Sequence, residues 1–149
     1  MKKFKFRLET LLKFRKFREK ELKIQLGEIV KYIEIVRQEI VELNQAIDDC
    51  YESQSSLMND TIKGRMIQFV PYFVEGKRAH IKSKENLLYA LQKKYDAKVA
   101  EVRKAMGDVK VIDKMKHKEI ALYNRELVKK EREQNEEVTN RKFVLNDTT

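Results

Sequence analysis

Residues that interrupt helices are scarce in this sequence. Its 149 residues include one Pro and four Gly, whereas Asp, Glu, Lys and Arg together make up 38%. A chain with so few breakers and so much Lys, Glu, Leu and Ile has the composition of long helices rather than of an ordinary globular domain. Its apolar fraction of 42% is too high for a disordered polyelectrolyte. The apolar side chains must therefore be buried along a stripe.

The groups that catalysis and metal binding require are also few. Cys50 is the only cysteine, which excludes a disulfide framework and indicates a reducing compartment. His80 and His117 are the only histidines, and neither has a recognised ligand spacing beside it. The sequence contains no glycine-rich phosphate loop and no G-x-S-x-G motif. We therefore expect no enzyme activity, no cofactor and no metal.

Long apolar runs are absent as well. None approaches the roughly 18–20 residues of a membrane span, and neither an apolar h-region nor a cleavage site follows the basic start of the chain. The sequence therefore predicts no membrane insertion and no signal peptide. The net charge of +9 suggests an acidic partner surface, nucleic acid or anionic lipid, without choosing among them.

A heptad pattern dominates the first part of the chain. Apolar residues alternate in steps of four and three, which averages 3.5 residues and is the coiled-coil period. The phase extends backward to Leu12 and Leu8, with Arg15 and Glu19 as polar interruptions. The positions of this pattern are Leu22, Leu26, Ile29, Ile33, Val36, Ile40, Leu43, Ile47 and the core-facing Cys50.

A second heptad pattern occupies the later part, with Lys84 and Lys98 as polar interruptions. Its positions are Ile81, Leu88, Leu91, Tyr95, Val102, Ala105, Val109 and Ile112. After Ile112 the phase becomes irregular, and the apolar face is predicted to continue through Met115, Ile120, Tyr123 and Leu127.

Gly64 and Pro71 lie between the two patterns, so we expect the chain to reverse between Asp60 and Arg65. Pro71 is expected in the first turn of the second helix. The predicted organisation of residues 1–149 is a single α-hairpin with helix one at 4–61, a turn at 62–71, helix two at 72–140 and a frayed tail at 141–149.

Two apolar stripes of this length must both be buried. An antiparallel two-helix coiled coil, a monomeric all-α hairpin, buries each stripe against the other, and a parallel dimer is the alternative. Charge supports the hairpin, because residues 24–60 carry two basic and eight acidic residues while residues 61–120 carry fifteen basic and seven acidic. Attraction between these segments favours antiparallel pairing.

The basic start admits several interpretations. Residues 1–23 contain ten Lys or Arg and three Glu among Phe and Leu. A nucleic-acid arm would direct the large apolar groups at phosphate, and a membrane-surface helix would compete with the coiled-coil face. A solvated helix end and a protein-docking end are the other possibilities. Near the turn, the cluster Met66, Phe69, Tyr72 and Phe73 either caps the hairpin or forms an exposed contact patch.

Four segments, in order, resemble one family. They are the pattern Phe4, Phe6, Leu8, Leu11, Leu12, Arg15 and Glu19, then "LGEI" at 26–29, "KVIDKMKHKE" at 110–119 and "REQNEEVTNRK" at 132–142. The chain resembles FliJ, the small coiled-coil protein of the flagellar type III export apparatus, over nearly its whole length.

The resemblance implies a stalk similar to the two-helix part of the rotary ATPase γ subunit. It implies binding to the hexameric flagellar export ATPase and promotion of its assembly, contact with the cytoplasmic domain of the export gate, and handling of export chaperones. It also implies a cytoplasmic location, peripheral to the inner membrane at the flagellar base. The alternatives are a nucleic-acid-binding coiled coil, the equivalent stalk of a virulence secretion system and a structural spacer.

By the same resemblance, the end with the two termini enters the ATPase and the hairpin end contacts the gate. The ATPase-binding candidates are Arg7, Leu8, Leu11, Arg15, Arg18, Lys114 and Lys118. The gate-binding candidates are Phe69, Phe73 and His80.

Overall fold

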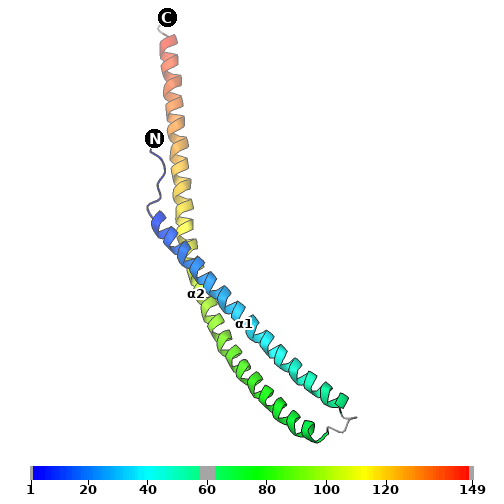
Figure 1. The fold of residues 1–149 in the computed structure, drawn as a ribbon. Helices are drawn as coiled ribbons and strands as arrows, with labels where there is room; N and C mark the ends of the chain where they lie inside the picture. The colour runs from blue at the N-terminus through cyan, green and yellow to red at the C-terminus, as the bar shows by residue number, and fades with distance from the viewer. Residues whose placement is uncertain (1, 58–62, 148–149) are drawn as a thin grey trace. The chain divides into compact units, whose positions relative to one another are not determined.

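The computed structural model describes residues 2–57 and 63–147. This part of the chain forms two α-helices, α1 (Glu9–Leu57) and α2 (Lys63–Asn146), and it contains no strand (Figure 1). The predicted all-α class with two long helices packed against each other is confirmed.

Both helices contribute to each of two compact units. The central unit is Lys20–Arg103, and the terminal unit combines Met1–Glu19 with Lys104–Thr149.

The core of the central unit lies between α1 and α2. One cluster joins Ile33 and Val36 of α1 to Leu91 of α2. Another joins Ile47 of α1 to Val70 of α2. The helices of this unit are antiparallel, because residues further along α1 contact residues earlier in α2: Val36 packs with Leu91, and Ile47 packs with Val70. Each such side chain, fully buried, stabilises the pairing by about 1.5–3 kcal/mol.

Half-buried side chains extend these two clusters along both helices. Most of them are positions of the predicted heptads. They are Ile29, Ile40, Leu87, Leu88 and Tyr95 around the first cluster, and Cys50, Phe73 and Ile81 around the second.

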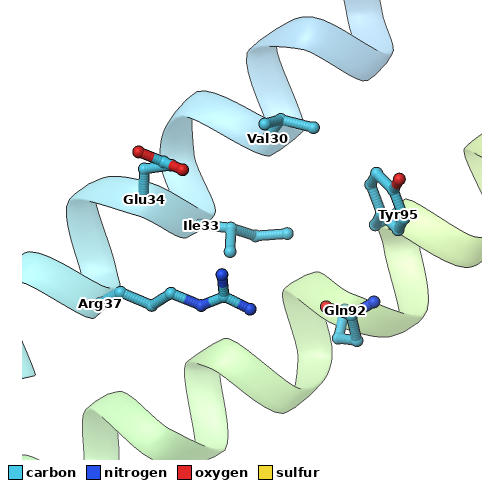
Figure 2. A pocket seen from close by; sticks show the side chains of 6 residues that line it. All are labelled: Val30, Ile33, Glu34, Arg37, Gln92 and Tyr95. Carbon is cyan, nitrogen blue, oxygen red and sulfur yellow. The ribbon is translucent and has the colours of Figure 1, made fainter.

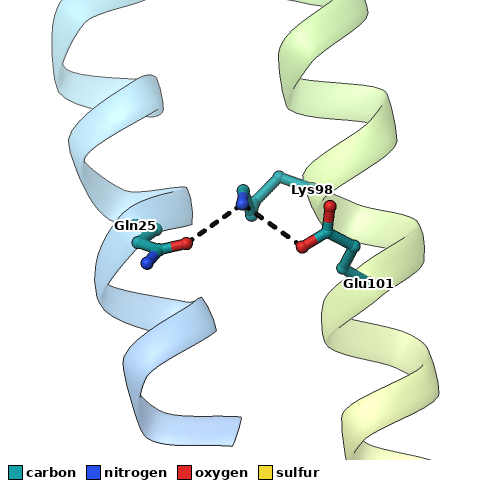
Figure 3. Close-up of polar contacts among 3 residues, drawn as sticks. All are labelled: Gln25, Lys98 and Glu101. Carbon is teal, nitrogen blue, oxygen red and sulfur yellow. Dashed lines mark hydrogen bonds and ion pairs between the residues drawn. The ribbon is translucent and has the colours of Figure 1, made fainter. Parts of the chain in front are cut away.

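The two lysines that interrupt the second heptad have polar partners. Lys84 Nζ lies 2.7 Å from Glu39 Oε2 across the helix pair. Lys98 Nζ donates to Gln25 Oε1 on α1 at 3.0 Å and lies 3.3 Å from Glu101 Oε2 on α2 (Figure 3). The lysine stems therefore cover apolar surface while their charges stay paired at the edge of the core.

The N-terminal arm, residues 2–8, is not helical, so the predicted helix start at residue 4 is wrong. The Phe4 ring lies 5.5 Å from the Tyr123 ring, and the Tyr123 hydroxyl donates to the Lys2 carbonyl at 3.0 Å. Phe6 is 8% exposed and belongs to the terminal core. A helix would direct Phe4 and Phe6 about 200° apart, whereas a non-helical arm brings both rings to α2.

The terminal core continues from the arm onto both helices. Leu12 of α1, which is 1% exposed, packs with Phe6 of the arm and with Val109 and Ile112 of α2. Leu8 is half-buried against the same cluster. The backward extension of the first heptad is thus confirmed as far as Leu12, whereas Leu8 packs on the core from the non-helical arm.

The start of α2 differs from its predicted position. Residues 63–71 are helical rather than a turn, and Pro71 lies two turns inside α2 instead of in its first turn. The predicted end of helix one at residue 61 lies outside the described residues. A proline inside a helix costs about 3 kcal/mol, partly because the carbonyl four residues earlier loses its partner. That carbonyl belongs to exposed Ile67, where water can reach it, while Val70 and Val74 are buried and hold the helix.

The end of α2 also differs, because residues 141–146 are helical where a frayed tail is predicted. From Val128 to Asp147 every described residue is exposed. A local ion pair supports this segment, with Lys129 Nζ at 4.0 Å from Glu133 Oε1. Such i,i+4 side-chain pairs add a few tenths of a kcal/mol each to an exposed helix. Further along, Thr139 Oγ1 donates to the Asn135 carbonyl at 2.8 Å.

Val36→Asp tests the central core. Val36 is 2% exposed, and a carboxylate there would be buried without a partner, so we expect a loss of about 3 kcal/mol or more in the free energy of unfolding. Thermal melting followed by circular dichroism measures it. The matched control is Ile35→Asp, since Ile35 is 46% exposed. Equal melting temperatures for the two variants would show that the core is assigned to the wrong face of α1.

Candidate functional site

The ATPase-binding candidates on the first part of the chain lie in the terminal unit but in different environments. Arg7 is exposed in the arm, and Leu8 is half-buried against the core. Leu11 is 37% exposed on the first turn of α1. Leu8 therefore contributes mainly to stability, whereas Leu11 is open to a partner.

The two candidate arginines of α1 also differ. Arg15 is half-buried, and its Nη1 donates to the Asp108 backbone carbonyl of α2 at 3.1 Å. Arg18 is exposed, one turn further along. Arg15 thus ties the two helices of the terminal unit together, and its substitution would disturb the helix pairing as well as any contact with a partner.

Phe14 and Phe17 are surface residues that the predicted site omits. They are 65% and 63% exposed, although large aromatic side chains are usually buried. Together with Leu11 they occupy successive turns of α1 on the side away from Leu12, because they follow each other at steps of three. We name Leu11, Phe14 and Phe17 the α1 aromatic surface. The signal in the sequence is that both phenylalanines fall outside the heptad that contains Leu8 and Leu12.

Basic residues surround the α1 aromatic surface. Lys13 and Lys16 are exposed on the same two turns, and Arg18 lies one turn after Phe14. Aromatic side chains and Arg are enriched in the anchor regions of protein interfaces.

The candidate lysines of α2, Lys114 and Lys118, are both exposed. Lys116, between them, is turned to the pair of helices instead. Its Nζ lies 2.9 Å from Glu9 Oε2 at the start of α1 and 6.0 Å from the centre of the Phe6 ring. Lys116 therefore joins the arm, α1 and α2.

The pKa of Glu9 lies below its ordinary value. The hydrogen bond from Lys116 is the main cause; desolvation opposes it, and the charges of Lys116, Lys13 and Lys16 add to the lowering. Because the folded-state pKa is depressed, this contribution to stability is present above the unfolded pKa of Glu9. It is lost as the pH falls through the folded-state pKa.

The gate-binding candidates lie on one face of α2 in the central unit. Phe69 is 58% exposed, Phe73 is half-buried and His80 is exposed. The rings of Phe69 and Phe73 are 5.7 Å apart, and Lys77 Nζ lies 5.3 Å from the centre of the Phe73 ring. His80 follows Phe73 by seven residues, so all three share a face.

A shallow groove lies beside the two phenylalanines. Its volume is about 370 Å³, and it opens between α1 and α2. The lining residues are Ala46, Asp49, Cys50, Ser53, Phe69, Val70 and Phe73. Of the predicted aromatic cluster, Tyr72 is 78% exposed, so part of that cluster faces solvent and part covers the core. The side chain of Met66 lies outside the described residues.

Another groove of about 280 Å³ lies further along the central unit (Figure 2). Val30, Ile33, Glu34 and Arg37 of α1 line one side, and Gln92 and Tyr95 of α2 line the other. The ionisable groups of this lining are the carboxylate of Glu34, the guanidinium of Arg37 and the phenol of Tyr95.

Metal ligands do not gather anywhere in residues 2–57 and 63–147, where no three of His, Cys, Asp or Glu are placed to hold an ion. Across the same residues, neither helix contains a segment both apolar and long enough to span a bilayer.

These features define a class of protein, the antiparallel two-helix coiled coil. The family described as "FliJ: Flagellar FliJ protein" matches residues 4–147. The chain therefore belongs to the FliJ family, a family of non-enzymatic components of flagellar protein export. No curated protein and no solved structure gives a significant match.

Lys116→Met tests the ion pair at the start of α1. Removing the ammonium group should raise the pKa of Glu9 toward its ordinary value of 4.5. The measurement is an NMR titration of the Glu9 carboxyl carbon in both proteins. Lys118→Met is the matched control and should leave that pKa where it is. If the Lys116 and Lys118 variants gave the same titration curve, Lys116 would not be the partner of Glu9.

Proposed function

We propose that this chain is the central stalk of the flagellar export apparatus, with the terminal unit docked in the pore of the hexameric export ATPase. Membership of the FliJ family supports the setting in flagellar export. The observation that carries the docking proposal is the α1 aromatic surface, where Phe14 and Phe17 are exposed beside Lys13, Lys16 and Arg18.

This arrangement suits docking better than it suits a solvated helix end. An exposed phenylalanine gains by leaving water, and each one fully buried in a partner contributes about 1.5–3 kcal/mol. The neighbouring cations favour a partner cavity with acidic walls and accelerate encounter. The ATPase pore is therefore proposed to contact Leu11, Phe14 and Phe17 directly, with Arg7, Arg18, Lys114 and Lys118 around them.

Arg15 and Leu8 have a different part in this proposal. Arg15 donates to the backbone carbonyl of Asp108, and Leu8 covers the terminal core. Both therefore stabilise the helix pairing of the terminal unit rather than supply most of the contact with the ATPase. A stiff end is important, because ordering a loose helix pair during binding would reduce the affinity.

The double variant Phe14→Ser, Phe17→Ser tests the docking surface. Both rings are more than half exposed, so helicity and melting temperature should stay the same while affinity for the purified export ATPase falls by about tenfold or more. Stimulation of ATP hydrolysis should fall with it. The matched control is Tyr89→Ser in the central unit, where Tyr89 is 65% exposed. Unchanged binding of the double variant would exclude the α1 aromatic surface as the contact.

We also propose that the part of the central unit next to the chain reversal links the stalk to the export gate and to export chaperones. The surface that supports this part is the row of Phe69, Phe73 and His80 on one face of α2. Phe69 is the residue of the row with most to gain on binding, because 58% of it is exposed.

Phe69→Ala should therefore weaken binding to the cytoplasmic domain of the gate by about tenfold and leave binding to the ATPase unchanged. Surface plasmon resonance with each partner measures both. Ile67→Ala serves as the control, since Ile67 is 55% exposed and lies outside the row. Equal losses for Phe69 and Ile67 would show that the row does not recognise the gate.

A further inference from the structure

A second row of apolar side chains runs along α2 of the terminal unit, outside the core. Val111, Met115 and Leu122 are 57%, 43% and 50% exposed. They are separated by four and seven residues, so they share one face of the helix. The core face of the same segment contains Val109 and Ile112, both buried. The exposed row is therefore distinct from the surface that packs on α1.

Met115 belongs to this row rather than to the face on which the sequence pattern places it. Ile120, Tyr123 and Leu127, which the pattern groups with it, are half-buried and continue the core face. The apparent irregularity after Ile112 therefore arises because two separate rows overlap in this part of the sequence.

Basic residues complete the row at heptad spacing. Lys118, Arg125 and Lys129 are exposed and continue the alternation of four and three residues. Lys129 Nζ lies 4.0 Å from Glu133 Oε1, in an ion pair that is open to solvent. We name the set the α2 stripe, which consists of Val111, Met115, Lys118, Leu122, Arg125 and Lys129.

The α2 stripe borders α1 on one side. Arg15 of α1 donates to the carbonyl of Asp108, which lies one turn before Val111 on the same side of α2. Leu11 lies one turn before Arg15 on α1 and is 37% exposed. A third helix lying along the α2 stripe would therefore have Leu11 within reach on its other side.

A shallow hollow extends the basic surface beyond Leu122. Its volume is about 420 Å³, and it is lined by Asn124, Arg125, Val128, Lys129 and Arg132. Three of the five lining residues are basic, and Val128 is 47% exposed among them. A partner helix would therefore find an apolar side chain surrounded by basic residues for a further turn of α2.

We propose that the α2 stripe is the docking surface for an acidic amphipathic helix of a partner protein, which packs on it as the third helix of a coiled coil. The 3.5-residue spacing fits a helix, and the three cations fit carboxylates at the positions that flank its apolar face. A second α2 stripe would repel this one, since both are basic. A nucleic acid would place phosphate against Val111, Met115 and Leu122.

This inference goes beyond the proposed function. It concerns an apolar row, Val111, Met115 and Leu122, that the proposed ATPase contact does not include. Lys118 and Leu11 border both surfaces, and the peptide test needs no ATPase, so the inference holds whether or not that docking occurs.

The test uses a synthetic helical peptide of about three heptads, with Leu at the seam positions, Glu beside them and one Trp. Because the chain contains no Trp, the fluorescence of the peptide reports binding without interference. We expect saturable binding with a gain in helix content. A peptide with Lys in place of Glu, and one of the same composition in scrambled order, should each bind at least about tenfold more weakly.

Two pairs of variants assign the binding to the α2 stripe. Val111→Ser should lower the affinity for the acidic peptide by about tenfold. Val138→Ser should leave that affinity unchanged, because Val138 is 52% exposed but lies outside the stripe. The double charge reversal Lys118→Glu, Arg125→Glu should abolish binding of the acidic peptide and allow binding of the Lys peptide. The control reversal Lys110→Glu, Lys142→Glu changes the net charge equally and should keep the original preference.

Several results would overturn the proposal. Equal binding of the scrambled peptide, or equal loss in both charge reversals, would reduce the interaction to unspecific attraction. Tighter binding of duplex DNA or of phosphatidylglycerol vesicles, lost in Val111→Ser, would assign the stripe to another occupant. A concentration-dependent dimer in sedimentation velocity, lost in the same variant, would assign it to a second copy of the chain.

Discussion

Mutual burial of two heptad faces is the constraint on which the rest of the molecule depends. Neither α1 nor α2 can leave its apolar face in water, and each covers that of the other through residues such as Leu12 and Val36. Once these faces are fixed, every other side chain has an assigned direction. Phe14 and Phe17 are functional candidates because the pairing turns them outward, beside the basic residues of the same turns.

The sequence predicts the helices and their pairing well because both depend on a simple period. It fails where a single tertiary contact outweighs local preference. Phe6 draws the arm out of the helix to reach Val109 and Ile112, and no periodic pattern reports that gain. Pro71 is the converse case. Its local preference predicts a turn, but the burial of Val70 in the central core keeps the surrounding residues helical.

The candidate site is less predictable than the fold, because family resemblance assigns residues without saying which ones face a partner. Leu8 and Arg15 lie in the terminal unit but contact the chain itself. The outward face of α1 consists of the apolar residues that do not belong to the core, and these form the α1 aromatic surface. On α2, Met115 likewise lies outside the core and belongs to the α2 stripe.

Site-specific photo-crosslinking can show whether the terminal unit docks in the export ATPase. A photoreactive phenylalanine analogue would be placed at position 14 in one protein and at position 89 in another, and each would be irradiated with the assembled ATPase. Docking of the terminal unit in the pore predicts an efficient cross-link from position 14 to residues that line the ATPase pore and none from position 89. Cross-linking from position 89 alone, or from neither position while the complex is formed, would contradict it.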